Sequence, residues 1–351
     1  MVNSNANAIG IIFPNSYDNL VPELAGDRLM ASIPFAGRYR IIDFLLSSLA
    51  NCGISNISIV VRENYHSLMD HLGSGREWDL LRKNGGLSIF PPYAEKNMKV
   101  YSGRVEALES ILQFLKNKKE KYVIMTDANI AVDFDFNDML RAHIESGADV
   151  TVAYTEQEIP AELIHAGVHG DMYYTLKLED GRVKRIFMNS EESGKQNLSM
   201  NIYIMEREAL IEKIHAAFVR GYSYFERDIL APRLEKYNVR AYKYEGYYAR
   251  ICGLKSYFDE NMKLLDDENL EALFTGGPVY TKIRDDNPTR YITGCKEKNN
   301  LVADGCVIEG DVENCILFRG VKIEKGAKIR NSVLMQDTVV KAGGRLDYVV
   351  T

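Results

Sequence analysis

The chain has 351 residues, of which 46% are hydrophobic and 26% charged, so we expect one large and one smaller globular domain and exclude a disordered chain. The formal net charge is −6, and Lys and Arg form no run interleaved with aromatic residues, which argues against a nucleic-acid partner. Five scattered cysteines without a C-x-x-C pair, and an N-terminal apolar stretch too short for a signal peptide or a membrane span, predict a cytoplasmic protein with no membrane partner.

The first two thirds of the chain alternate short apolar runs with longer segments of helical period, which is typical of a layered α/β domain. A helix is predicted over 41–52, because its apolar residues fall on one face and Gly53 follows it. The clearest predicted strands are Ala8–Phe13, Asn56–Val61 and Tyr122–Met125.

An antiparallel hairpin is predicted next, because an Asp-Gly step at Asp180-Gly181 joins two alternating segments, Tyr173–Leu178 and Val183–Phe187. Further helices are predicted near 206–217, 225–235 and 256–265. The turn sequence Thr275-Gly276-Gly277-Pro278 predicts a domain boundary, which gives an α/β domain over 1–277 and a second domain over 278–351.

Beyond residue 300 the apolar residues recur with a spacing of six. The spacing holds for Ile323, Ile329 and Met335, and in a second register for Val321, Ala327, Val333 and Val339. This spacing is typical of hexapeptide repeats, which form a parallel β-helix, with Gly305, Gly310, Gly320 and Gly326 at the corners. An ordinary series of antiparallel strands is the alternative.

One long segment, Ile33-Pro34-Phe35-Ala36-Gly37-Arg38-Tyr39-Arg40-Ile41-Ile42-Asp43-Phe44, resembles the sequence that follows the active-site loop of ADP-glucose pyrophosphorylases. The similarity continues in the same order through His66-Ser67-Leu68, His71, Trp78-Asp79-Leu80, Tyr101-Ser102-Gly103, Ser199-Met200, Phe225 and Asp228-Ile229. The resemblance implies a nucleotidyltransferase-like, Rossmann-like domain with a mixed sheet, followed by a left-handed parallel β-helix.

Members of that family transfer an adenylyl group from ATP to glucose 1-phosphate, a reaction between anions that depends on backbone N–H donors, cationic side chains and Mg²⁺. The family supplies the donors in a glycine-rich loop, G-G-x-G-T-R, with a Lys further on. Those positions here are Asn15, Ser16, Tyr17, Asp18, Asn19, Leu20 and Met30. The glycines and both cations are replaced, and Asp18 adds an anion in a phosphate-facing turn.

The family holds its metal between an Asp at the end of a strand and a second Asp in a W-x-D-x-G-like segment. Asp127 matches the first, whereas alignment on Gly253 puts Ile251 in place of the second. We therefore expect no metal and no cofactor in this chain, with Mg²⁺ held by a catalytic partner, and Asp127 as a vestigial ligand or a capping or turn residue.

A third family motif places a Lys against the sugar phosphate in an F-V-E-K-P-like strand end. Asn189 stands at that position and Met188 replaces the Glu. An amide carries no net charge, so this comparison predicts weak binding of a sugar phosphate.

Three arginines, Arg28, Arg38 and Arg40, lie in the segment that in this family is near the binding site of phosphorylated effectors. They form either an anion site or a solvated basic surface paired with Asp27 and Asp43. The sequence leaves both interpretations open.

Other candidate motifs favour structural roles. His66 and His71 are five residues apart, which is not the i, i+4 spacing of a metal pair on a helix, and Gly73-Ser74-Gly75 lacks the Lys of a nucleotide loop.

The resemblance therefore suggests a catalytically impaired, regulatory subunit that forms a hetero-tetramer with a catalytic ADP-glucose pyrophosphorylase in glycogen biosynthesis. The alternatives are an independent sugar-phosphate or nucleotide sensor, an active nucleotidyltransferase with other site residues, and an acyltransferase based on the β-helix. The last lacks the basic His such enzymes need, because no His follows His215.

Overall fold

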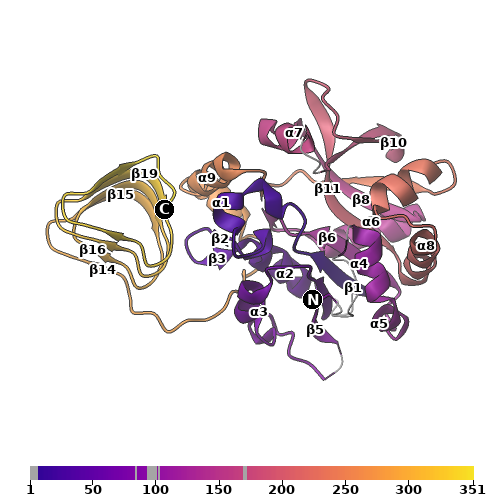
Figure 1. Ribbon diagram of the computed structural model, residues 1–351, viewed down its shortest axis with the longest axis horizontal. Coiled ribbons are helices and arrows are strands. Elements are labelled where there is room, and N and C mark those ends of the chain that lie inside the picture. Colours follow the sequence, from indigo (N-terminus) through magenta and orange to yellow (C-terminus); the bar gives the residue numbers. More distant parts are fainter. Residues whose placement is uncertain (1–6, 84, 93–100, 102, 169–171) are drawn as a thin grey trace.

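The computed structural model describes residues 7–83, 85–92, 101, 103–168 and 172–351. Figure 1 shows an α/β domain on the right and a coil of short strands, coloured orange to yellow, on the left. Among the described residues, no helix combines the length and the apolar character needed to cross a membrane.

The α/β domain is built on a nine-stranded mixed sheet. Its strands lie in the order β5 (Gly86–Phe90), β4 (Asn56–Val60), β1 (Ala8–Phe13), β6 (Tyr122–Asp127), β11 (Lys195–Glu206), β8 (Val150–Glu158), β12 (Val239–Lys243), β10 (Arg182–Met188) and β9 (Tyr174–Glu179). Strands β1, β4, β5 and β6 pair in parallel, whereas β11 is antiparallel to both β6 and β8. The predicted Rossmann-like mixed sheet is confirmed.

Apolar side chains cover both faces of this sheet. Along β1, Ala8 and Ile12 face one core, while Ile9 and Ile11 face the other. The first core is closed by α2 (Ile41–Asn51), α3 (His66–Leu72) and α6 (Phe136–Ser146). The second is closed by α4 (Arg104–Ser110), α5 (Leu112–Lys116) and α8 (Arg207–Val219). A strand buried on both faces is apolar throughout, which explains the continuous run in β1.

The predicted hairpin is confirmed, because β9 and β10 pair antiparallel around Asp180 and Gly181. The helix predicted near 225–235 is instead divided into a π-helix at Phe225–Leu230 and a 3₁₀ turn at Ala231–Arg233. Pro232 has no N–H with which to continue a regular helix.

Smaller elements complete the domain. Two ribbons pair β2 (Pro34–Phe35) with β3 (Tyr39–Arg40) and β7 (Ile130–Val132) with β13 (Tyr248–Arg250). The remaining α-helices in the described part are α1 (Pro22–Ala25), α7 (Ala161–Val168), α9 (Leu254–Lys263) and α10 (Asp267–Ala272). After α10 the chain has no helix or strand until residue 290, and the predicted boundary at 277 falls in this stretch.

The C-terminal domain is a parallel β-helix, as predicted. One ladder contains β14 (Arg290–Tyr291), β16 (Val307–Ile308), β18 (Lys322–Ile323) and β20 (Val339–Val340). The other contains β15 (Lys296–Val302), β17 (Asp311–Leu317), β19 (Lys328–Leu334) and β21 (Arg345–Asp347). All these neighbours pair in parallel, which excludes the alternative of antiparallel strands.

Each long strand of the second ladder bends at an asparagine in the left-handed conformation. Asn299, Asn314 and Asn331 have φ angles of 53°, 53° and 44°. Their amides form a ladder: Asn299 Nδ2 donates to Asn314 Oδ1 at 3.0 Å, and Asn314 Nδ2 donates to Asn331 Oδ1 at 3.3 Å. Asparagine tolerates positive φ, so these residues make corners that we did not predict.

The six-residue spacing holds for only part of the β-helix. Asp311 pairs with Lys328, 17 residues further on, which is one residue short of three hexapeptides. Ile323 and Ile329 lie in the core of the coil, but Val339 is 43% exposed and Val333 points out of the coil. At Val333, Met335 and Val339 the six-residue recurrence therefore no longer marks core positions of the coil.

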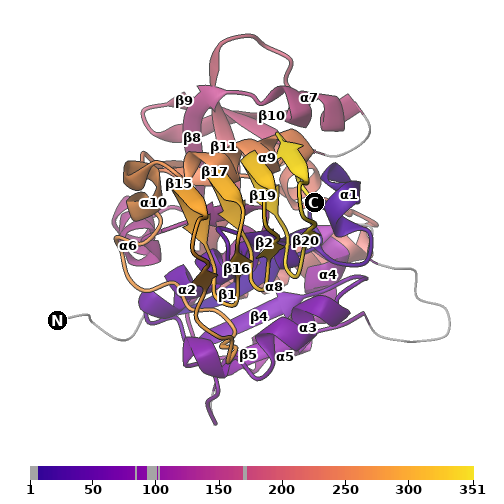
Figure 2. The same ribbon diagram turned by 90° about the vertical axis from the view of Figure 1, so that its left-hand side faces the viewer.

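The two domains share an apolar interface, with the β-helix against the α/β domain in Figure 2. Ile316, Phe318 and Val333 of the β-helix join a cluster that includes Phe35 and Tyr257 of the α/β domain. The hydroxyl of Tyr257 donates to the carbonyl oxygen of Pro34 at 2.7 Å. The segment that carries the family resemblance is therefore placed at the junction between the domains.

Candidate functional site

A cavity of about 290 Å³ opens where the ends of β1 and β6 meet the loop after β1. Its lining includes Asn15, Ser16 and Asp18 from the predicted degenerate loop, together with Asp127. The carboxyl ends of parallel strands are the usual place for ligands in such sheets, which makes this cavity the candidate site. Ser102, within the matched Tyr101-Ser102-Gly103 stretch, lies outside the described residues.

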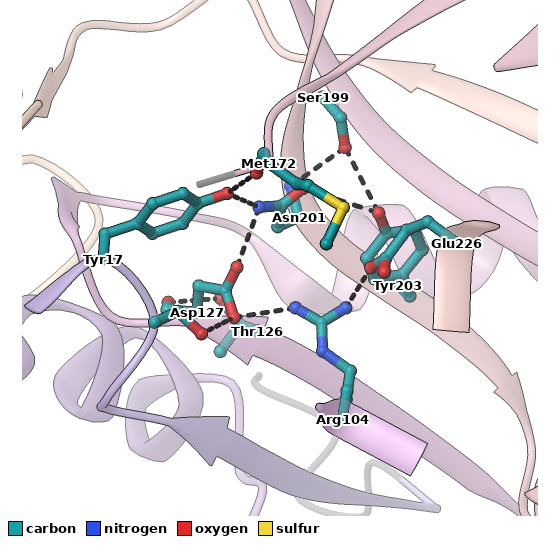
Figure 3. Close-up of polar contacts among 10 residues, drawn as sticks. Tyr17, Arg104, Thr126, Asp127, Met172, Ser199, Asn201, Tyr203 and Glu226 are labelled. Carbon is teal, nitrogen blue, oxygen red and sulfur yellow. Dashed lines mark hydrogen bonds and ion pairs between the residues drawn. The ribbon is translucent and has the colours of Figure 1, made fainter. Parts of the chain in front are cut away.

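Asp127 ends β6 and is 2% exposed. Its Oδ1 accepts a hydrogen bond from Ser16 Oγ at 2.7 Å. The same oxygen accepts one from Arg104 Nη2 at 2.7 Å, and Oδ2 accepts one from Asn201 Nδ2 at 2.8 Å (Figure 3). These contacts join separate parts of the chain, so Asp127 is neither a helix cap nor a local turn residue. Both carboxylate oxygens are already used within the protein.

Arg104, the first residue of α4, links two buried carboxylates. Its guanidinium binds Asp127 through Nη2 and Glu226 through Nη1, as Figure 3 shows. It also lies 4.9 Å from the ring centre of Phe13 and 5.5 Å from that of Tyr203. Burial alone would lower the pKa of Arg104, but the two carboxylates outweigh it and raise the pKa well above its usual value. Arg104 is therefore a permanent cation inside the site.

A chain of hydrogen bonds extends from the other side of Asp127. Asn201 Nδ2 also donates to Tyr17 Oη at 2.7 Å, and Tyr17 Oη donates to the carbonyl oxygen of Met172 at 2.8 Å. Burial raises the pKa of Tyr17 above its usual value, so its phenol stays neutral and able to donate. Asn201 has a φ of 56° at an irregularity of β11, between residues 199 and 203, which aims its amide at this chain.

Ile251 lies in the apolar core and not at the cavity. Ile251 is fully buried in an apolar cluster with Tyr257, and its neighbour Arg250, which does not line the cavity, lies near enough to Asp127 for their charges to interact. Arg250 Nη2 donates to the carbonyl oxygen of Ser199 at 2.7 Å. Burial alone would lower the pKa of Arg250, but Tyr248 and, more weakly, Asp127 raise it.

The alignment on Gly253 places Ile251 at the position of the second carboxylate. Alignment of the same motif on its aromatic position, Tyr248, would have put Arg250 in place of the second carboxylate. In that second alignment a cation stands where the family has an anion.

Asp18 is held by the loop itself. Its Oδ1 accepts from the N–H of Met30 at 2.7 Å, and its Oδ2 accepts from Asn15 Nδ2 at 2.8 Å. Asn15 Oδ1 in turn accepts from the N–H of Arg62 at 2.6 Å. Met30 is fully buried and Leu20 is partly buried in apolar clusters. The positions that lost their cations have become packing residues, and the carboxylate of Asp18 fixes the loop.

Asp18 should make the stability of the protein depend on pH. Burial raises the pKa of this carboxyl to about 6, so the folded state holds the proton more tightly than the unfolded state. The contribution of this proton to the free energy of unfolding is complete below pH ~4 and is lost as the pH rises through ~6. Its upper limit is about 3 kcal/mol. Asp18→Asn should flatten this part of a pH series of urea denaturation curves, whereas Asp27→Asn, an exposed control, should not. Equal slopes for wild type and Asp18→Asn would contradict the assignment.

Asn189 serves the backbone. It follows β10 with a φ of 50°, its Oδ1 accepts from the N–H of Tyr173 at 3.0 Å, and its Nδ2 donates to the carbonyl oxygen of Gly167 at 3.0 Å. Asn189 is not among the described residues that line the cavity. The amide thus joins the hairpin to α7.

The basic segment lies at a second, smaller cavity of about 40 Å³ between the domains. Arg38 and Arg40 line it together with Lys282, Arg284 and Arg319. Arg28 is not in that lining. Burial is the main cause that lowers the pKa of Arg40, and the positive charge of Arg28 lowers it further.

The expected pairing of Arg40 with Asp43 is not formed through its guanidinium. Arg40 Nη1 donates to Ser67 O at 2.8 Å and Ser67 Oγ at 2.9 Å, and only the backbone N–H of Arg40 binds Asp43, at 2.9 Å. Oδ1 of Asp43 also accepts a hydrogen bond from Nε2 of His71 at 2.6 Å. His71 is buried against Trp78, which supports its predicted structural role. Across the described residues, no group of three or more His, Cys, Asp or Glu side chains is placed to hold a metal.

Comparison with known proteins gives the same two domains. A family model described as nucleotidyl transferase matches residues 24–267, and one described as GlmU-like, C-terminal hexapeptide matches residues 286–351. The chain is 32% identical to the glycogen biosynthesis protein GlgD of Bacillus subtilis (strain 168) over 93% of this chain and 83% of that protein. It is 35% identical to the glycogen biosynthesis protein GlgD of Geobacillus stearothermophilus, again over 93% of this chain and 83% of that protein.

A further relative is the glucose-1-phosphate adenylyltransferase of Bacillus mycoides (strain KBAB4), which is 34% identical over 87% of this chain and 80% of that protein. The fold, the matched segments and these relatives agree. The chain therefore belongs to the nucleotidyl transferase family, in the ADP-glucose pyrophosphorylase-like group that contains both the GlgD proteins and the glucose-1-phosphate adenylyltransferases.

Proposed function

We propose that this chain is a regulatory, catalytically impaired subunit of a glucose-1-phosphate adenylyltransferase that acts in glycogen biosynthesis. The names of the GlgD and adenylyltransferase relatives support the process and the reaction. The occupancy of Asp127 supports the impairment, because Ser16, Arg104 and Asn201 bind both of its oxygens.

The reaction joins two anionic substrates, so the site must supply positive charge and N–H donors to the phosphates. The loop over Asn15–Leu20 brings side chains and one carboxylate to this place, and Tyr17 fills part of it with a buried ring. Of the arginines that line the cavity, Arg104 is engaged with Asp127 and Glu226, and Arg62 pairs with Glu63. The cavity persists, but both of these cations are already paired with carboxylates of the chain.

The proposed partner is a catalytic adenylyltransferase subunit that holds Mg²⁺, in a hetero-tetramer. The β-helix supports such an assembly because β14 and β15 lie at the open edge of their ladders. Unpaired strand edges are templates for association unless another chain covers them.

The cationic cavity at Arg38, Arg40 and Arg284 supports binding of a phosphorylated effector, because none of the three forms an ion pair with a carboxylate within the described part of the chain.

A mixing experiment tests this proposal. ADP-glucose formation is measured for a catalytic homologue alone and with this chain, with and without a sugar phosphate, alongside size-exclusion chromatography. We expect co-elution and a change in rate or effector response of ~5-fold or more, the usual size of such coupling. Arg284→Ala should weaken the effector response but not co-elution. Separate elution and an unaltered catalytic rate would reject the subunit proposal and favour an independent sensor, which would still bind the sugar phosphate.

A further inference from the structure

Two buried carboxylates at the centre of the domain share one internal cation. The side chains of Asp127 and Glu226 are 2% and 5% exposed, and both bind the guanidinium of Arg104, which is 11% exposed. These residues come from β6, the π-helix at 225–230 and the start of α4, respectively. A charge buried to this degree destabilises a fold unless it is paired.

This arrangement does not fit a divalent cation. Oδ1 of Asp127 already accepts two hydrogen bonds, from Ser16 and Arg104, and a metal bound at Oδ2 would have to lie beside the amide of Asn201. It would also approach the guanidinium of Arg104, and like charges repel strongly where water is scarce. Arg250, whose pKa Asp127 helps to raise, adds a second positive charge from β13. Mg²⁺ needs near-octahedral oxygen ligands, and both oxygens of Asp127 already have partners.

We infer that Arg104 is a built-in counter-cation that replaces a divalent metal at Asp127 and Glu226, so that the site is organised without metal. The guanidinium forms charge-assisted hydrogen bonds to both carboxylates in a fixed fork. It thereby connects α4, β6 and the π-helix around the cavity. The fold around the site, and any assembly that depends on it, is consequently independent of magnesium. This inference concerns the residues of this chain and holds whether or not the chain is a regulatory subunit.

The inference predicts a gain of metal binding when the cation is removed. Arg104→Ala removes the cation that binds both Asp127 and Glu226, so it should lower the melting temperature by about 10 °C. In the wild-type protein one edge of the Arg104 guanidinium spans the two carboxylates. In the variant, one divalent ion with its water ligands can therefore occupy the space that the guanidinium leaves. Millimolar Mn²⁺ or Mg²⁺ should restore at least about half of the loss, since ligands that bind only the folded state stabilise it.

The experiment compares melting curves and Mn²⁺ binding, followed by electron paramagnetic resonance, for the full chain in metal and in EDTA. Wild type and Arg104→Lys, which keeps the charge, should show no saturable Mn²⁺ binding at this site. For each of these two proteins, the melting temperature in metal should differ from that in EDTA by less than ~1 °C. Arg104→Ala combined with Asp127→Asn and Glu226→Gln should lose the metal response and melt above the single variant in EDTA. If Arg104→Ala does not fold, Arg104→Met, which keeps the length of the side chain, takes its place.

Two results would overturn the inference. The first is saturable Mn²⁺ binding by wild type that Asp127→Asn abolishes, because the site would then accept a metal beside Arg104. The second is a metal response of the Arg104 variant that persists when both carboxylates are removed, because the ion would then bind elsewhere.

Discussion

Purified alone, this chain should form ADP-glucose at least ~10³-fold more slowly than a catalytic relative, because loss of even one preorganised donor at a reacting phosphate or oxyanion costs ~10²–10³-fold. Several such groups are replaced here. The loop at Asn15–Leu20 lacks the glycines and the cation, Met30 lies in the core, and Asp127 is bound to Arg104. The measurement is a pyrophosphate-release assay on protein prepared in a host without any adenylyltransferase.

Single reversions should not restore this activity. Leu20→Arg returns one cation but leaves Tyr17, Asp18 and Arg104 in place, and groups that act as a unit are strongly non-additive. The matched control is the reciprocal Arg→Leu change in the catalytic relative, which should lower its rate sharply. Turnover by the wild-type chain within ~10-fold of the relative would contradict the impairment, as would rescue by Leu20→Arg alone.

Replacement of Asp43 should cause a large loss of stability. Asp43 is fully buried near the start of α2, where it accepts from the N–H of Arg40 at 2.9 Å and contacts Nε2 of His71 at 2.6 Å. Asp43→Ala leaves two buried polar groups without a partner and removes a carboxylate from a helix N-terminus, so we expect a loss of about 3–5 kcal/mol. Urea denaturation of the α/β domain, followed by the fluorescence of Trp78, gives the measurement.

Asp70, which lies on α3, provides a control for the replacement of Asp43. Its side chain is 69% exposed and pairs with Lys282 at 3.0 Å, a surface ion pair. Asp70→Ala should cost less than about 1 kcal/mol. If Asp43→Ala costs no more than Asp70→Ala, the buried contact does not hold the start of α2, and the role assigned to Asp43 and His71 is wrong.

The order of strands and helices could be predicted where the chain signals it locally. The run at Ala8–Phe13, the Asp-Gly step at Asp180 and the recurrence of Ile323 and Ile329 each predicted the element that is found. The π-helix at Phe225–Leu230 and the Asn corners of the β-helix were missed, because both depend on where hydrogen-bond partners lie in neighbouring elements.

The sequence by itself determined the family, the two domains and the loss of glycines and cations over Asn15–Leu20, because each is a property of residue types in order along the chain. Only the tertiary structure decided what replaced the lost chemistry. Arg104 and Glu226 are 122 positions apart, and Tyr17 meets Asn201 across 184. Such contacts carry no local periodicity, because they arise when strands and helices from distant parts of the chain pack together. For this reason nothing in the sequence around Arg104 indicates that it neutralises Asp127 in the folded protein.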